Sequence, residues 1–425
     1  MLQFSNFKAV KTLSILSSRI GFILLLVLAV SELHAQNTYI TITGLLQDSK
    51  TGDKVSFATI TVPNTGIGTV SNSDGEFTLK VSTALNAEYF EVSHLSYATK
   101  QFKISEAAGT GKTFLLDIQP VQLKEIPVVP KDARSIVETA FLNTGKNYSQ
   151  VPNMMNGFYR EYVMQRRDYI SISEAVIDIY KSPYSGIQED QVRIFKGRKA
   201  SNVKKADTLL VQLQGGPKVL MLLDIVKNPD LSIAMDDLDN YLFEFGTVVN
   251  IDNKQNWVIE FSPNPLKEGP FYFGKLYISQ ENYAITRAEF SLDLRDATKA
   301  SAAFVKKKPL GLTFMPASTS YLVTYKEQEG KFYLNYVRVD LKFRCDWKKK
   351  LFKNNYGIMS EAAITGRSED HIVRFGNEEI FKSGMVFAEK VEDFTDEDFW
   401  GEHNIIEPEE SIENAIKKLS KNIDR

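Results

Sequence analysis

The chain has 425 residues, of which 43% are hydrophobic and 24% are charged, a composition typical of globular proteins. This length predicts two or three folded domains. The formal net charge of −2 argues against a nucleic-acid-binding protein, because such proteins need a dense basic face to displace the counterions of the phosphates.

The N-terminal segment has the features of a secretion signal. Three basic residues precede an apolar run at residues 20–30, which is too short for an ordinary membrane span. We expect cleavage after Ala35, so that residues 1–35 form a signal peptide and the mature protein is exported. The alternative is an uncleaved anchor helix.

Residues 36–129 alternate between short expected strands and turns. The strands are expected at residues 39–46, 58–62, 76–81, 89–94, 99–104 and 113–118. The turn Asn72-Ser73-Asp74-Gly75 favours a tight hairpin, because an Asp-Gly step suits the backbone of such turns. Turn signals at this regular spacing predict a small all-β sandwich.

A family pattern runs through the same residues. It is carried by Gly44–Asp48, Thr51-Gly52, Phe57–Val62, Gly68–Val70, Ser73–Leu79 and Val92–Tyr97. Their order resembles the carboxypeptidase regulatory-like domain, a prealbumin-like sandwich, although Ser96 stands where glycine is common. Leu123–Ile126 resembles the segment that closes this domain in Bacteroidetes envelope proteins. The resemblance implies an accessory domain without catalysis.

Residues 130–390 predict a larger antiparallel β-rich domain with covering helices. Pro127–Lys131 predicts a linker, after which Asp132 is expected to cap an amphipathic helix over 133–146. Residues 271–278 and 283–294 predict a hairpin. Residues 333–347 alternate between an apolar and a polar face, which predicts a long antiparallel strand with one wet side.

Two segments of this domain suggest its curvature. The stretches Phe273–Ile278 and Tyr283–Glu289 resemble the half-barrel of lipoprotein-carrier proteins, a curved antiparallel sheet with helices across its concave side. Gly157–Glu161 and Ser173–Ala175 are similar to uncharacterised Bacteroidetes envelope proteins that carry the same regulatory-like domain. The predicted fold class is therefore mainly β with minor α, a sandwich followed by a half-barrel.

Such a concave face could hold an acyl chain, because burial of apolar surface is non-directional. We predict that five aromatic residues line it: Trp257, Tyr277, Phe290, Phe343 and Trp347. The alternative is that helices fill the face and that these side chains are ordinary core. Residues 391–425 predict an acidic segment and a C-terminal helix over 412–422, with an apolar stripe that includes Ile412 and Leu419.

No recognisable catalytic pattern appears in the sequence. Gly109–Thr113 imitates the end of a phosphate-binding loop but lacks the preceding glycine and the following helix, so we interpret it as a hairpin turn. The histidines His94, His371 and His403 are not spaced as zinc ligands. Cys345 alternates with apolar residues, which favours a buried thiol over a nucleophile. We expect no enzyme activity, no metal and no cofactor.

The leading hypothesis is a non-catalytic exported envelope protein, located in the periplasm or at the periphery of the outer membrane, with an interaction, scaffold or ligand-binding role. One alternative is a carrier of lipid or another hydrophobic ligand. Another is a hydrolase whose site residues lie too far apart in sequence to recognise. The expected partners are other envelope proteins, including TonB-dependent receptors, which also begin with this regulatory-like domain, and not nucleic acid.

Overall fold

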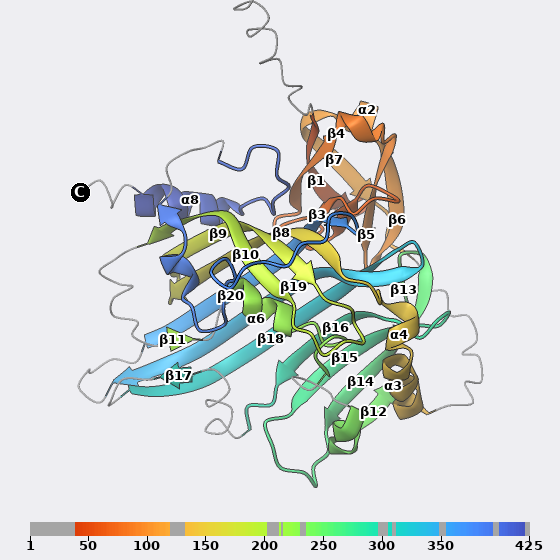
Figure 1. Ribbon diagram of the computed structural model, residues 1–425, viewed down its shortest axis with the longest axis vertical. Coiled ribbons are helices and arrows are strands. Elements are labelled where there is room, and N and C mark those ends of the chain that lie inside the picture. The colour runs from red at the N-terminus through yellow and green to blue at the C-terminus, as the bar shows by residue number, and fades with distance from the viewer. Residues whose placement is uncertain are drawn as a thin grey trace, which may run out of the picture. The chain divides into compact units, whose positions relative to one another are not determined.

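The computed structural model describes residues 39–119, 132–201, 212–213, 216–229, 235–295, 305–307, 312–347, 354–393 and 399–420. The expected signal peptide and the expected linker lie outside these residues. The described chain is mostly β-strand with few helices, as predicted (Figure 1). Among its helices, none combines the length and the apolar character that a membrane span requires.

The first strands form the two sheets of a sandwich. One sheet has the order β4-β1-β7 and the other has the order β3-β2-β5-β6. The strands are β1 (Tyr39–Asp48), β2 (Thr59–Thr61), β3 (Gly68–Val70), β4 (Glu76–Ser82), β5 (Tyr89–His94), β6 (Tyr97–Lys103) and β7 (Gly109–Leu116). Phe77, Phe90 and Phe114 fill the core, where the rings of Phe77 and Phe90 each lie 5.5 Å from that of Phe114.

Two turn predictions in the sandwich are wrong. Asn72-Ser73-Asp74-Gly75 does not close a hairpin, because β3 and β4 belong to different sheets. Its tight geometry comes from Asn72 Oδ1, which accepts hydrogen bonds from the backbone N–H groups of Asp74 and Glu76 at 2.9 and 2.8 Å. Gly109–Thr113 is not a hairpin turn either. It follows helix α2 (Ile104–Ala107) and begins β7, which pairs with β1 in parallel.

The remaining chain forms a twelve-stranded sheet with the order β12-β14-β15-β16-β18-β19-β20-β8-β9-β10-β21, in which β13 also pairs with β14. Its strands are β8 (Asn153–Gln165), β9 (Asp168–Lys181), β10 (Gln191–Ser201), β12 (Tyr241–Phe245), β13 (Val249–Ile251), β14 (Lys254–Pro263), β15 (Tyr272–Ser279), β16 (Ile285–Leu292), β18 (Leu312–Gln328), β19 (Lys331–Trp347), β20 (Asn354–Ser368) and β21 (Glu392–Asp393). Two short strands, β11 (Gln212–Leu213) and β17 (Val305–Lys307), pair separately. The predicted hairpin is β15–β16, and the predicted long strand is β19.

Side chains alternate between two faces of this large sheet. We call the face that carries Tyr159, Val337 and Ile259 the inner face, because these residues share one core with the helices. The opposite, outer face carries Phe158 and Tyr336.

Besides α2, the described residues form these helices and 3-10 turns: η1 (Thr83–Leu85), α3 (Ala133–Leu142), α4 (Thr144–Asn147), α6 (Pro217–Leu222), η3 (Met235–Asn240), η4 (Phe387–Glu389) and α8 (Glu410–Ser420).

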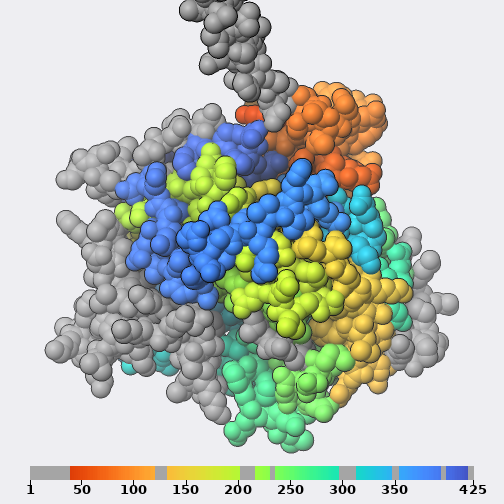
Figure 2. All heavy atoms as spheres, in the orientation of Figure 1, coloured from red at the N-terminus to blue at the C-terminus, as the bar shows by residue number. Residues whose placement is uncertain are grey.

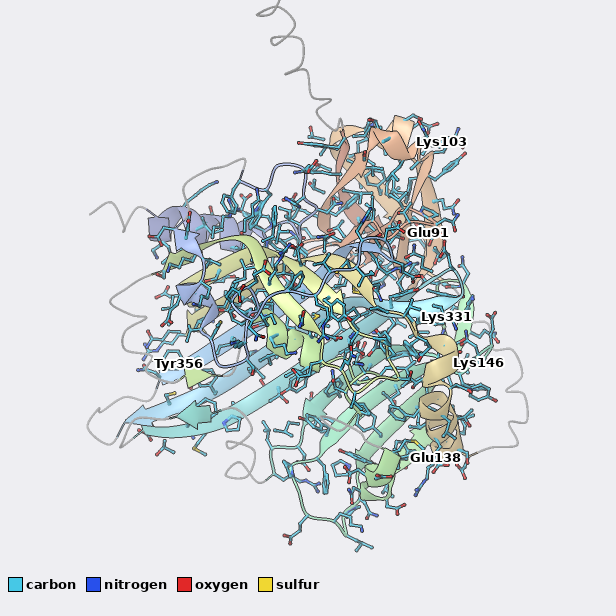
Figure 3. The ribbon with its side chains drawn as sticks, viewed as in Figure 1. Glu91, Lys103, Glu138, Lys146, Lys331 and Tyr356 are labelled. Carbon is cyan, nitrogen blue, oxygen red and sulfur yellow. The ribbon has the colours of Figure 1, made fainter. Side chains whose placement is uncertain are left out.

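Helices cover much of the inner face. The predicted cap is present, since Asp132 accepts a hydrogen bond from the Ser135 N–H at 2.7 Å. Helix α3 ends at Leu142, four residues earlier than predicted, and α4 follows it. Lys331 at the start of β19 donates to the Lys146 carbonyl at 2.6 Å, and the two residues lie close together in Figure 3.

Helix α6 and the segment after β20 cover the inner face near β10, where Leu220, Phe381 and Phe387 join the core. The Phe381 N–H donates to the Val192 carbonyl at 2.7 Å, which fastens this segment to β10. In Figure 2 the blue spheres of this segment lie against yellow-green spheres of the β10 region. Much of the inner face is therefore buried beneath a second layer of helices and connecting segments.

The C-terminal strap, residues 399–409, crosses the outer face. Its Trp400 ring packs edge-on against Phe158 at 5.3 Å, and Ile406 is buried beside it. Helix α8 starts two residues earlier than predicted, and its apolar stripe packs as expected: Ile412 and Leu419 contact Ile172 and Ala200.

Candidate functional site

The five aromatic residues predicted to line the curved face do not share one surface. Trp257 and Phe290 lie in the inner core, where Trp257 packs on Tyr283 at 5.2 Å and Phe290 stacks on Tyr321 at 5.0 Å. Both are buried, so helices and neighbouring strands already fill the surface around them.

The other three occupy different places. Tyr277 lies on the outer face, because its strand neighbours Leu276 and Ile278 are the ones that join the inner core. Phe343 lies on the inner face at its far end, where it stacks on Tyr356, labelled in Figure 3, at 5.5 Å. Trp347 ends β19, and its side chain is outside the described residues. The binding role of the five residues stays a prediction.

Three polar side chains lie side by side on the inner face, toward the end where Phe343 and Tyr356 stack. We call them the polar row: Ser360, Glu161 and Ser173. The strand register places them side by side, since Glu161 is paired with Ser360 of β20 and with Ser173 of β9. Side chains directly opposite each other on neighbouring strands lie within contact distance. All three residues follow the parity of the inner core, because Ala362, Tyr159 and Ala175 lie two positions away on their strands.

Glu161 is the centre of the polar row. Its carboxylate accepts a hydrogen bond from the Tyr159 hydroxyl at 2.6 Å and another from the Gly216 backbone. Part of the side chain remains accessible, but protein atoms surround the carboxyl group. Burial therefore raises the pKa of Glu161 to about 7, against the smaller opposing effect of the two hydrogen bonds.

Gly216 can approach the carboxylate because it has no side chain. Its φ of 87° lies in the region that favours glycine, and a Cβ there would meet the Phe381 ring at 2.6 Å. The Ser360 hydroxyl completes the arrangement by hydrogen bonding to Tyr159. A chain of hydrogen bonds thus orients Glu161 from one side.

Ser173 completes the row from the other side. It is fully buried, and its Oγ has no hydrogen-bond partner among the described residues. An unpaired buried hydroxyl costs free energy, which a bound water or a ligand group can recover. Ser173 therefore marks a position where the protein offers an unused hydrogen-bonding group next to Glu161.

Beyond the polar row the inner face becomes apolar. The next row, which we call the half-exposed row, is Leu341, Ile358, Val163 and Ser171, side by side on β19, β20, β8 and β9. All four are partly accessible, in contrast to the buried residues of the inner core. The aromatic pair Phe343 and Tyr356 follows one step farther along β19 and β20.

Sequence reasoning did not identify the polar row. The motif Gly157–Glu161 stood out only as a family likeness. A usable signal was present: Met155, Tyr159, Glu161 and Val163 share one parity on β8, so Glu161 is an acidic residue in an apolar series. Its neighbours Ser360 and Ser173 lie on strands distant in sequence, and their proximity required the strand order.

Two further groups of buried charges are internally paired. On the outer face, the Arg160 guanidinium contacts Glu174 at 2.8 Å and Glu361 at 3.3 Å, and donates to the Ile406 carbonyl of the C-terminal strap at 2.7 Å. Elsewhere, Lys181 contacts Asp190 at 2.6 Å and Asp224 at 2.7 Å. In both groups opposite charges meet, so we assign them to stability and not to ligand binding.

A cavity of about 360 Å³ is lined by the loop 61–68 and by the β18–β19 hairpin. Three of its charged groups form ion pairs with one another: Lys326 contacts Glu91, labelled in Figure 3, at 3.3 Å and Asp252 at 2.9 Å. Within the described residues, no three histidine, cysteine or acidic side chains are placed to hold a metal ion. Cys345 is buried, and burial raises the pKa of its thiol to about 11.

Comparison with known families identifies the first domain. Residues 42–128 match the family model described as CarboxypepD_reg-like domain, in agreement with the sequence analysis. The match covers less than half of the chain and leaves the large sheet unassigned. No curated protein shows significant sequence similarity to this chain.

Solved structures give weak likenesses. A DUF1329 family protein from Desulfovibrio piger has 12% identity and a TM-score of 0.26, over 57% of this chain and 96% of its own. A LolA superfamily protein from Nitrosomonas europaea has 13% identity and a TM-score of 0.20, over 60% and 100%. MucB, in complex with MucA(peri), has 9% identity and a TM-score of 0.17, over 53% and 92%. Scores this low carry no argument about function.

Proposed function

We propose that this chain is an exported, non-catalytic envelope protein that binds a hydrophobic ligand on the inner face of its large sheet. The ligand occupies the half-exposed row, between the polar row and the aromatic pair Phe343–Tyr356. The CarboxypepD_reg-like domain acts as an accessory module for contacts with other envelope proteins, among which TonB-dependent receptors are candidates. The signal-like segment 1–35 supports export.

The half-exposed row is the observation that supports ligand binding. Its apolar members Leu341, Ile358 and Val163 lie on three adjacent strands and keep accessible surface. The inner core a few residues away is closed by α6, Phe381 and Phe387. Burying exposed apolar surface is favourable by about 25 cal/mol per Å², so a ligand covering this row gains free energy without specific geometry.

Native mass spectrometry of the mature protein purified from its own envelope tests the proposal. We expect a bound apolar molecule that is lost after delipidation. The Val163→Trp variant places a larger side chain in the half-exposed row and should reduce the bound fraction. Leu266→Trp is the matched control, because Leu266 is 91% exposed in the loop after β14 and should leave binding unchanged.

Wild-type protein without any bound molecule, and without any response to added lipid, would contradict ligand binding. If Val163→Trp retains as much bound ligand as the wild type, the ligand does not bind at this row. The expectation that the chain is not an enzyme stays a prediction. A hydrolase screen that finds turnover, abolished by one substitution, would overturn it.

A further inference from the structure

The acidic residue of the polar row, Glu161, has no positively charged partner among the described residues. No described residue forms an ion pair with Glu161, whose hydrogen bonds come from the neutral Tyr159 hydroxyl and the Gly216 backbone. Lys199 follows on β10 beside Ser173, but its ammonium donates to the Ala388 carbonyl at 2.7 Å. Buried charged groups in proteins are normally paired, so within the described part of the chain the carboxylate has no counter-charge that would stabilise it.

Unused hydrogen-bonding capacity lies on the same side. A carboxylate offers about four acceptor positions, and two are used by Tyr159 and Gly216. The Ser173 Oγ, on the neighbouring strand, has no partner among the described residues. A group that donates two or more hydrogen bonds can therefore bind Glu161 and Ser173 together.

We propose that the ligand is an amphiphile with a protonated amine head group, which binds between Glu161 and Ser173 while its apolar chain lies over the half-exposed row. This inference rests on the proposed function and names the class of ligand. An ammonium supplies three donors and the missing positive charge. Charge-assisted hydrogen bonds to a carboxylate are about twice as strong as neutral ones.

The order of the rows fits this chemistry. Residues two apart on a strand are about 6.6 Å apart, so the aromatic pair lies about 13 Å from the polar row. Moving along β8 and β20 from Glu161, the inner face changes from polar to apolar at Val163 and Ile358, and to aromatic at Tyr356. A ligand with one charged end and one apolar end matches this sequence of surfaces.

An anionic head group fits the site less well. The Tyr159 hydroxyl and the Gly216 N–H point to Glu161 and are not free to bind a second anion. A ligand carboxylate would also face the Glu161 carboxylate, and two like charges at this distance repel each other. A neutral alcohol can bond to Ser173 but supplies no charge.

Calorimetric titration of the full mature chain with three probes of equal chain length tests the inference. The probes are dodecylamine, 1-dodecanol and dodecanoate, each below its aggregation concentration. We expect dodecylamine to bind about ten- to a hundredfold more tightly than the alcohol, and dodecanoate to bind most weakly. Glu161→Gln keeps the shape of the side chain and should make the amine and the alcohol equivalent.

Glu260→Gln is the matched control, because Glu260 is half exposed on the outer face and pairs with Lys275. It should keep the full preference for the amine. Ser173→Ala should weaken amine binding by roughly two- to tenfold. Circular dichroism and thermal unfolding of each variant confirm that the fold is intact.

Equal affinity for the three probes, weakened in each case by Val163→Trp, would overturn the amine inference and leave the proposed function standing. The same holds if Glu161→Gln retains the preference for dodecylamine. If none of the probes binds the wild-type chain, the proposed function itself fails.

Discussion

Replacing Arg160 by methionine removes the guanidinium that joins three parts of the outer face. Its side chain is 1% exposed, and it contacts the carboxylates of Glu174 and Glu361, which are 1% and 4% exposed. It also donates to the carbonyls of Ile406 and Glu407 in the C-terminal strap, at 2.7 and 3.2 Å. Methionine fills much of the volume but supplies neither charge nor hydrogen bonds.

The expected loss follows from what remains buried. Glu174 keeps a contact with Arg198 at 3.3 Å, and Glu361 keeps one with Arg338 at 3.4 Å, but both lose their most buried partner. Removing one member of a buried ion pair typically destabilises a protein by ~3–5 kcal/mol, and we expect Arg160→Met to fall in this range. Adding Glu174→Gln should recover part of the loss, because it removes a buried charge that keeps only its 3.3 Å contact with Arg198.

Urea unfolding followed by tryptophan fluorescence gives the free energy of unfolding by linear extrapolation. Arg134→Met is the control, because Arg134 is 45% exposed and pairs with Glu138 and Asp239 at the surface. Exposed ion pairs contribute ~1 kcal/mol or less, so this variant should unfold almost like the wild type. If Arg160→Met costs no more than Arg134→Met, the buried network does not fasten the strap as we describe.

Three further predictions concern other buried groups. Lys181→Met should reduce the free energy of unfolding by ~3–5 kcal/mol, whereas Lys275→Met, on a half-exposed pair, should cost ~1 kcal/mol or less; equal urea midpoints would contradict this. Burial raises the pKa of Glu161 from 4.5 to about 7, so the stability of the wild type relative to Glu161→Gln should be greatest below pH 4.5 and should fall as the pH rises through about 7. Parallel pH profiles of the two proteins would refute that shift. Finally, the buried thiol of Cys345, with its pKa raised to about 11, should resist a thiol reagent at pH 8 until urea is added, and rapid labelling of the native chain would disprove it.

The alternation within single strands was predictable from the sequence. It assigned Cys345 and Phe343 to the apolar side of β19, and it identified the stripe of α8. These patterns are local, since one strand or helix carries the whole signal. For the sandwich, the family pattern predicted the kind of domain, which the match of residues 42–128 to the CarboxypepD_reg-like model confirms.

The relation between strands was not predictable in the same way. The alternation within β15 does not say which of its two faces the helices cover. Tyr277 lies on the outer face because Leu276 and Ile278, the residues on either side of it, are the ones that join the inner core. β8 pairs with β20, although Arg160 and Glu361, which contact each other across this pair, are 201 residues apart. The polar row arises from this long-range pairing. A turn signal such as Asn72–Gly75 likewise fixes a bend but not the sheet that the chain enters next.

Hydrogen–deuterium exchange of the purified protein, with and without saturating dodecylamine, tests most directly whether the inner face binds a ligand at the polar and half-exposed rows. We predict slower exchange in peptides from β8 and β20, and unchanged exchange in β14 and β15, where helices already cover the sheet. Protection confined to β14 and β15, or no protection anywhere, would contradict the account.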